Sequence, residues 1–291
     1  DSPINLQVVS YILEHNGALV QTASNGEDAL MLLQSEFNDY DAVLMDVQMP
    51  GIDGLEVTQR IRSTLGRISL PIIALTAGAL VEEKNRALEA GMNDFLTKPI
   101  NPSELINVLR QSVEAYRDKE IPIETLSAHS SEDDAWPVII GLNLDVAKIL
   151  LLGDKRLFLE TLDSLLQEYA NLAISPQINV DVPESAALRI QIASQVHRLR
   201  SVSGMVGAEK VQQLASEAEK VLRTEYEPAK EVLMALSLEL QELYQASEET
   251  LDAWRKETID ASKFKGVAPL LKLETVQHIL KLLTEQDLNA L

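Results

Sequence analysis

Residues 42–54 read AVLMDVQMPGIDG, and this stretch decides the fold of the first half of the chain. The apolar run before Asp46 is typical of a strand that is buried on both faces, as strands of parallel sheets are. Residues 70–76 form a second such run, and residues 94–97 form a short third one. Helical patterns alternate with these strands. The alternation predicts an α/β fold, a doubly wound parallel sheet with helices on both faces.

The positions of the elements follow from the hydrophobic period and from capping residues. Asn101, followed by Pro102, suits the start of the last helix of this half. Gly91 marks the end of the helix before it. Strands are expected at residues 18–22, 40–47, 70–76 and 94–97, and helices at residues 6–15, 27–36, 55–65, 81–90 and 101–117.

Polar residues that suit phosphoryl chemistry lie next to these elements. Asp46 ends one strand, Thr76 ends another, and Lys98 follows the last. Asp1 precedes the first helix. Ligands of an open parallel sheet bind beyond the carboxyl ends of its strands, so these side chains are expected to converge. Two carboxylates can hold Mg²⁺, and a carboxylate can form an acyl phosphate.

Taken together, the motifs of this half resemble the response-regulator receiver domain. The matching pieces are MDVQMP at residues 45–50, DG at 53–54, LTA at 75–77 and DFLTKP at 94–99. The resemblance covers residues 1–118. It implies a flavodoxin-like sheet with the strand order 2-1-3-4-5.

By this resemblance, Asp46 is the phosphorylation site. Mg²⁺ would be bound by the carboxylates of Asp1 and Asp46 and by the main-chain carbonyl of Gln48. The alternative interpretation is a structural receiver that serves only as a docking surface and in which Asp46 is not phosphorylated.

The resemblance also assigns roles to three further side chains. Thr76 and Lys98 would contact the phosphoryl oxygens. Phe95 would be the switch aromatic, whose rotamer follows Thr76. The peptide bond between Lys98 and Pro99 is expected to be cis, since such a tight turn can require it.

One strand of the family pattern has no counterpart in the sequence. The first strand of a receiver ends in two adjacent acids, and Asp1 matches only the second of them. In the family order this strand lies inside the sheet, and its loss would leave backbone groups of its neighbours without partners. We expect residues upstream of Asp1 to supply it. The apolar residues 137–140 are an alternative source.

The second half of the chain has a different pattern. Residues 119–140 are rich in Pro, Ser and acidic residues and are predicted to be a linker. Residues 141–258 show only the helical period, which predicts an all-α four-helix bundle. Residues 259–291 are expected to be a C-terminal helical extension. The apolar stripes contain Phe158, Leu162, Leu165, Ile192, Val196, Leu199, Val211, Ala218, Leu236 and Leu240.

His197 lies on one of these helices, next to the core residue Val196. The helical period places it about 100° from the apolar stripe, so its imidazole is expected to face solvent. Ala193, Ser201 and Gly204 share its face, and such small residues would let another protein approach closely. An exposed imidazole nitrogen is a competent phosphoryl acceptor. Arg200 is placed to reach a phosphate carried by His197.

This region resembles a histidine phosphotransfer (HPt) domain. The matching pieces are HRLR at residues 197–200, Gly204, GA at 207–208 and LGD at 152–154. Two positions depart from the family: Arg200 replaces the usual Lys, and Ser201 replaces the usual Gly. Arg keeps the charge of Lys but presents a different geometry, which can tune partner choice or rate.

Composition and missing motifs exclude several functions. The net charge is −20, which argues against a nucleic-acid surface. The chain has no cysteine, which fits a reducing, cytoplasmic location, including the cytoplasmic part of a membrane-bound sensor. No apolar run is long enough for a membrane helix, so no membrane contact is expected in this segment. No nucleotide-binding motif occurs, so any ATP-dependent kinase activity must lie outside this chain.

The combination predicts a two-component phosphorelay of the kind found at the C-terminus of hybrid sensor histidine kinases. Asp46 would accept the phosphoryl group from a kinase histidine, with Mg²⁺ present. His197 would pass it to, or receive it from, the aspartate of a response regulator.

Two alternatives stay open. In one, phosphorylation of Asp46 switches an interaction surface near Thr76 and Phe95, and His197 is not phosphorylated. In the other, the chain is an inert docking scaffold.

Overall fold

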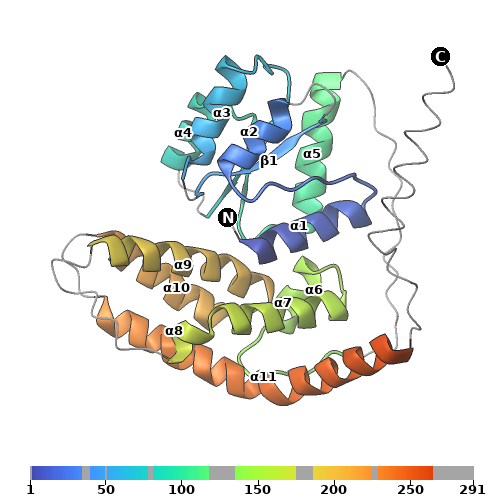
Figure 1. Ribbon diagram of the computed structural model, residues 1–291, viewed down its shortest axis with the longest axis vertical. Helices are drawn as coiled ribbons and strands as arrows, with labels where there is room; N and C mark the ends of the chain where they lie inside the picture. The colour runs from blue at the N-terminus through green and yellow to red at the C-terminus, as the bar shows by residue number, and fades with distance from the viewer. Residues whose placement is uncertain are drawn as a thin grey trace, which may run out of the picture. The chain divides into compact units, whose positions relative to one another are not determined.

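The computed structural model describes residues 2–34, 40–49, 51–77, 81–117, 135–174, 186–224 and 229–264 (Figure 1). Residues 1–248 form one compact unit that contains both the sheet and most of the helical region. The elements of the first half are α1 (Pro3–His15), α2 (Gly26–Gln34), β1 (Val43–Asp46), α3 (Gly54–Ser63), β2 (Ile72–Thr76), α4 (Val81–Glu89), β3 (Asp94–Thr97) and α5 (Pro102–Arg117).

The three strands form a parallel sheet in the order β1-β2-β3, as predicted. The register pairs Asp46 with Leu75 and Thr76 with Thr97. The carboxyl ends of all three strands therefore meet at one edge. Asn101 caps α5, since its side chain accepts hydrogen bonds from the backbone N–H groups of Ser103 and Glu104.

Helices cover both faces of the sheet. A core of fully buried side chains that includes Val57, Ile61 and Ile72 joins α2, α3 and α4 to one face. Figure 1 shows α5 on the other side of the strands. The α/β prediction is therefore confirmed.

The strand predicted at residues 18–22 is wrong, because these residues form no strand and Leu19 is fully exposed. Among the described residues, the edge of β1 that faces away from β2 has no partner strand. A cavity of about 1080 Å³ lies there, lined by residues of α1, 18–23, β1 and α5. Residues 18–22 cannot pair with β1 across that space, and an extended segment without a neighbour is not a strand.

Residues 137–140 do not fill this cavity, so that alternative is also wrong. Residues 135–139 form no strand. The ring of Trp136 lies 5.0 Å from that of Phe158, and Ile139 is buried. This segment therefore packs on the helical region. Most of the predicted linker, residues 118–134, lies outside the described residues.

The second half is helical, as predicted, and its apolar stripes form the core. Leu162, Leu165, Val196 and Leu199 are all 0% exposed. The last helix crosses the predicted boundary between the bundle and the extension at residue 258 and runs to Phe264, and residues 265–291 of the predicted extension lie outside the described residues. The helices are α6 (Leu144–Leu150), α7 (Lys155–Glu168), α8 (Ala170–Ile174), α9 (Ala186–Met205), α10 (Glu209–Arg223) and α11 (Lys230–Phe264).

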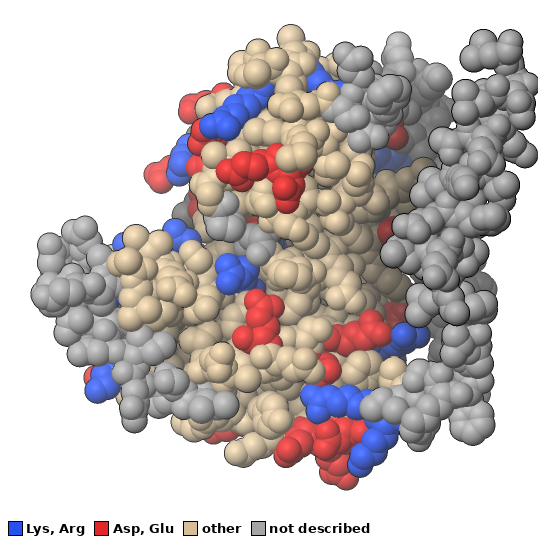
Figure 2. Space-filling view, in the orientation of Figure 1, with Lys and Arg blue, Asp and Glu red and all other residues tan. Residues whose placement is uncertain are grey.

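The surface carries charge of both signs. Figure 2 shows acidic and basic side chains next to one another on one face, without a continuous basic patch. None of the helices within the described ranges combines the length and apolar character needed to cross a membrane.

Phe158→Ala tests the core of the bundle. The side chain is 0% exposed and contacts Trp136, so its removal should lower the free energy of unfolding by about 3–5 kcal/mol. Urea unfolding followed by tryptophan fluorescence, to which Trp136 and Trp254 contribute, measures this loss. Leu238→Ala is the control, because Leu238 is 57% exposed and its removal should cost less than about 0.5 kcal/mol. Equal effects of the two variants would contradict this assignment of the core.

Candidate functional site

Asp46 lies at the carboxyl end of β1 and is held by two groups. The Nζ of Lys98 lies 2.5 Å from its Oδ2, and the backbone N–H of Gln48 donates to its Oδ1 at 3.1 Å. The side chains of Lys98 and Asp46 are only 3% and 11% exposed. The sheet positions Lys98, since its N–H donates to the carbonyl of Thr76 at 2.8 Å. The predicted cis bond between Lys98 and Pro99 is confirmed.

The Asp53-Gly54 pair shapes the loop that follows Asp46. A Cβ on Gly54 would lie 2.1 Å from the carbonyl oxygen of Asp46, so no larger residue fits without a shift of the backbone. Asp53 caps α3 by accepting from the N–H of Glu56 at 2.8 Å. The start of α3 is therefore fixed against the end of β1.

Thr76 and Phe95, the predicted switch pair, both contact α4. The hydroxyl of Thr76 donates to Glu83 at 2.8 Å, and the Nζ of Lys84 lies 4.4 Å from the centre of the Phe95 ring. Thr76 and Phe95 thus contact consecutive residues of α4. A change at Thr76 can therefore act on α4 directly.

The predicted Mg²⁺ ligands are described only in part. Asp1 lies outside the described residues, while Asp46 and Gln48 are on the sheet edge as expected. Within the described ranges, no group of three or more His, Cys, Asp or Glu side chains could hold a metal ion. The Asp46 carboxylate and main-chain carbonyls are nevertheless the hard oxygen donors that Mg²⁺ prefers, so the chemistry of this edge fits the ion.

His197 is buried, so the prediction that it faces solvent is wrong. It is only 3% exposed. Its Nδ1 lies 2.8 Å from Oε1 of Glu219, which comes from α10. Its Nε2 is buried and has no hydrogen-bond partner among the described residues. The helical period had placed the imidazole off the core stripe of its own helix, but it could not reveal what covers that face.

Glu219 connects His197 to two arginines. Its Oε2 accepts from Arg200 and its Oε1 accepts from Arg223, both at 3.1 Å. Burial alone raises the pKa of this carboxyl. The hydrogen bond from His197 and the charges of the two arginines lower the pKa by more than burial raises it. Glu219 is therefore ionised and can only accept, so the proton of this hydrogen bond lies on Nδ1 of His197, and in the neutral imidazole the lone pair lies on Nε2.

The faces of α9 and α10 that carry Arg200 and Arg223 also contact the first half of the chain. Arg200 donates to the carbonyl of Ala77, and Arg223 donates to Oε1 of Gln48 at 2.9 Å. A Cβ on Gly204 would lie 3.1 Å from Cγ of Pro99, so the receiver half of the same chain comes close at this small residue.

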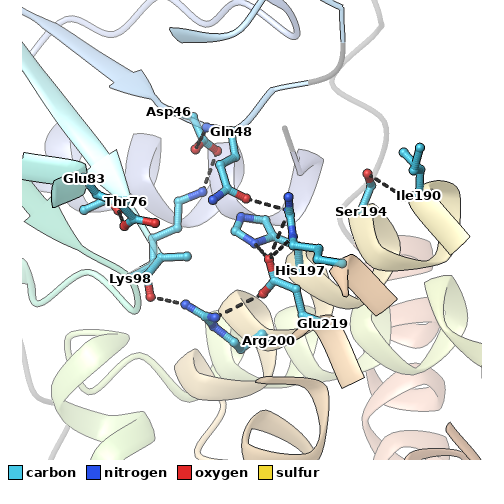
Figure 3. Close-up of polar contacts among 12 residues, drawn as sticks. Asp46, Gln48, Thr76, Glu83, Lys98, Ile190, Ser194, His197, Arg200 and Glu219 are labelled. Atoms are coloured by element: carbon cyan, nitrogen blue, oxygen red, sulfur yellow. Dashed lines mark hydrogen bonds and ion pairs between the residues drawn. The ribbon is translucent and has the colours of Figure 1, made fainter. Parts of the chain in front are cut away.

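Most of the labelled residues of the two halves gather in one cluster, while Ser194 and Ile190 lie to one side (Figure 3). Figure 3 shows Asp46, Gln48 and Lys98 grouped with His197 and Arg200. A cavity of about 340 Å³ beside the cluster is lined by His197, Gln48 and Arg223, among others. Arg200, which is predicted to reach a phosphate carried by His197, donates to Glu219 and to the carbonyl of Ala77.

A second contact between the halves lies on α1. This helix packs against α7 and α9, and the hydroxyl of Tyr11 donates to Asp154, the N-cap of α7. The hydrogen bond to this carboxylate, with burial adding to it, raises the pKa of Tyr11 to about 12. Tyr11 therefore stays a neutral donor at physiological pH.

Sequence reasoning missed Glu219, Arg223 and Tyr11. A signal for Glu219 exists, since it is the one charged residue within a buried run of α10 that contains Ala215, Ala218 and Leu222. A charge in such a position must have a partner.

Comparison with known families agrees with this geometry. The family model of the response regulator receiver domain matches residues 1–110, and that of the Hpt domain matches residues 155–250. The chain is a receiver domain followed by an Hpt domain. Receiver and Hpt domains, together with relatives that are sensor kinases, make it a part of a two-component phosphorelay.

Several relatives are sensor kinases. Sensor protein GacS of Pseudomonas syringae pv. syringae is 33% identical over 77% of this chain and 24% of its own length. Sensor histidine kinase RcsC of Escherichia coli K12 is 43% identical over 41% of the chain and 12% of its own length. The receiver–Hpt chain thus spans a quarter or less of the length of these sensor proteins.

Two further relatives match the receiver part. An uncharacterized 14.6 kDa protein of Leptolyngbya boryana is 41% identical over 38% of the chain and 83% of its own length. The receiver domain of a sensor histidine kinase from Pseudomonas aeruginosa PAO1, solved with a magnesium ion coordinated in the active site cleft, is 37% identical. That match covers 39% of this chain and 91% of the solved one, with a TM-score of 0.36.

Glu219→Gln tests the buried carboxylate of the Hpt domain. The folded-state pKa of Glu219 lies below its ordinary value of 4.5, so its charge stabilises the fold above that pH and loses this effect as the pH falls through the lowered pKa. The variant should be less stable than the native chain by about 1–3 kcal/mol near neutral pH.

Urea unfolding at a series of pH values measures this difference, which should shrink in acid. Glu217→Gln is the matched control, because Glu217 is exposed on the same helix and its change should cost less than about 0.5 kcal/mol at every pH. A difference for Glu219→Gln that does not vary with pH would contradict the role of its charge.

Proposed function

We propose that Asp46 and His197 are successive phosphoryl acceptors of the relay. Asp46 takes the group from a phosphohistidine of an upstream kinase, and His197 passes it on to the aspartate of a separate response regulator. One observation carries this proposal: the groups that bind Asp46 and the groups that bind His197 belong to the same cluster, joined by the contacts of Arg200 and Arg223.

The first step is the attack of an Asp46 carboxylate oxygen on the phosphorus of the kinase phosphohistidine. A P–O bond forms, the P–N bond breaks, and its electron pair returns to the kinase imidazole. Lys98 lies against the carboxylate and offsets negative charge on the incoming group. Asp46 and the Gln48 carbonyl, with Asp1, would hold Mg²⁺, which supplies further charge neutralisation when bound.

In the second step, the lone pair on Nε2 of His197 attacks the phosphorus of the Asp46 acyl phosphate. An N–P bond forms, the P–O bond breaks, and the electron pair leaves on the carboxylate. The ring becomes a cation that keeps its proton on Nδ1, where Glu219 stabilises it. The reverse step breaks the N–P bond and forms the P–O bond again, so transfer can run in either direction.

The relay has protein partners at both ends. Since the chain holds no nucleotide motif, the phosphohistidine must come from a kinase region elsewhere in a sensor protein or in another chain. The chain contains no cysteine, which fits the reducing cytoplasm, including the cytoplasmic part of a membrane-bound sensor.

A second candidate function is a phosphorylation-switched interaction module. Thr76 and Phe95 both contact α4, which favours a surface that responds to Asp46. In that case His197 carries no phosphate, so labelling separates the two functions.

Asp46→Asn and His197→Gln test the relay. The chain is exposed to labelled acetyl phosphate with Mg²⁺, and phosphate on aspartate is separated from phosphate on histidine by its lability in alkali and in acid. Asp46→Asn should lose both labels, because the histidine label depends on Asp46. His197→Gln should lose only the acid-labile, alkali-stable label.

His15→Gln is the control and should keep both labels, since His15 ends α1 and takes no part in the cluster. A native chain that carries aspartate label but no histidine label would refute the relay and favour the interaction module. A native chain without any label would refute both.

A further inference from the structure

The residue two positions after Asp46 is joined to both phosphoryl acceptors. The main-chain N–H of Gln48 donates to Oδ1 of Asp46 at 3.1 Å. Its side-chain Oε1 accepts from Nη2 of Arg223 at 2.9 Å. Gln48 therefore touches the receiver acceptor with its backbone and the Hpt domain with its side chain.

Arg223 continues this path to the histidine. Its Nε donates to Oε1 of Glu219 at 3.1 Å, and the same oxygen lies 2.8 Å from Nδ1 of His197. A guanidinium presents five N–H donors in a fixed plane, so contacts with Gln48 and Glu219 at the same time constrain its position. The orientation of the His197 imidazole is thereby linked to the side chain at position 48.

We propose that Arg223 is a positioning residue that also selects the receiver by its side chain at position 48. A neutral hydrogen-bond acceptor there binds the free side of Arg223 and holds Glu219 and His197 in line with Asp46. A cationic side chain there would repel Arg223 and turn it away from Glu219. The Hpt domain should thus prefer receivers that carry such an acceptor two residues after the phosphorylated aspartate.

The chemistry of Gln48 supports this selection. Arg223 is about half exposed, at 52%, so a water molecule could solvate it in place of Gln48. The contact is therefore not needed to bury the arginine, and its value lies in geometry and in choice of partner. By contrast, Arg200 reaches a main-chain carbonyl, that of Ala77, which every receiver has at that place.

The inference rests on the proposed function, and a single-turnover experiment separates the two. His197 of the full chain is first labelled with phosphoramidate in EDTA, where the group goes from the ammonia nitrogen of the reagent to Nε2 and ammonia leaves. After removal of the reagent, Mg²⁺ is added, and transfer to Asp46 is followed as loss of the alkali-stable label. A native chain that loads His197 but never transfers would refute the relay itself.

Gln48→Met should slow transfer about three- to tenfold, because one hydrogen bond at a half-exposed site is lost. It should change the rate of phosphoramidate loading much less, because a small diffusing reagent does not need the imidazole to be aligned with Asp46. In an Arg223→Met background, Gln48→Met should have no further effect, as expected for two members of one contact. Additive losses would overturn the inference.

Gln48→Lys gives a sharper test of selection. It should slow transfer more than Gln48→Met does, because it adds repulsion to the loss of the hydrogen bond. Arg223→Met should remove this extra loss. Lys220→Met is the matched control, since Lys220 is an exposed cation on the same helix, and it should neither slow transfer nor rescue Gln48→Lys. Equal transfer rates for Gln48→Met and Gln48→Lys would overturn the selection.

Discussion

The hydrogen bond between His197 and Glu219 involves a carboxylate that is kept ionised by its lowered pKa although its side chain is only 8% exposed. A buried charge is stable only when it is paired, and Arg200 and Arg223 provide the opposite charge. Each guanidinium has donors left over after it binds Glu219, and it uses them on the receiver, at Ala77 and Gln48. The pairing that allows the carboxylate to be buried thus also creates the contact surface of the Hpt domain.

Because Arg200 and Arg223 bind both Glu219 and the receiver, only one receiver at a time can occupy this surface. His197, Arg200 and Arg223 all face the receiver of the same chain, so in the proposed relay a downstream receiver must bind the same surface after the first one has left. The second contact, between Tyr11 and Asp154, lies outside the polar cluster on α1 and α7. Exchange of receivers therefore requires both contacts to open: the polar one at Ala77 and Gln48, and the one that α1 makes with α7 and α9.

The receiver could be predicted from sequence wherever local signals set its structure. The apolar runs that end at Asp46 and Thr76 are strands, and Lys98 lies against Asp46 because parallel strands bring their carboxyl ends to one edge. The strand expected at residues 18–22 failed for a non-local reason. A strand is stabilised by its neighbour, and across the cavity beside β1 none of the described segments offers one.

Non-local contacts also limited what could be predicted for the Hpt site. The helical period predicted that His197 lies off the apolar stripe of α9, yet the residue is buried like its core neighbours Val196 and Leu199. The helical period predicts which face of a helix is apolar. It does not predict whether a second helix or domain packs on the remaining faces. Glu219 follows His197 by 22 residues, and only the pairing of α9 with α10 brings them together. The acidic residue within the apolar stripe of α10 is the feature of the sequence that indicates this pairing, because a buried carboxylate is stable only beside a donor such as the imidazole.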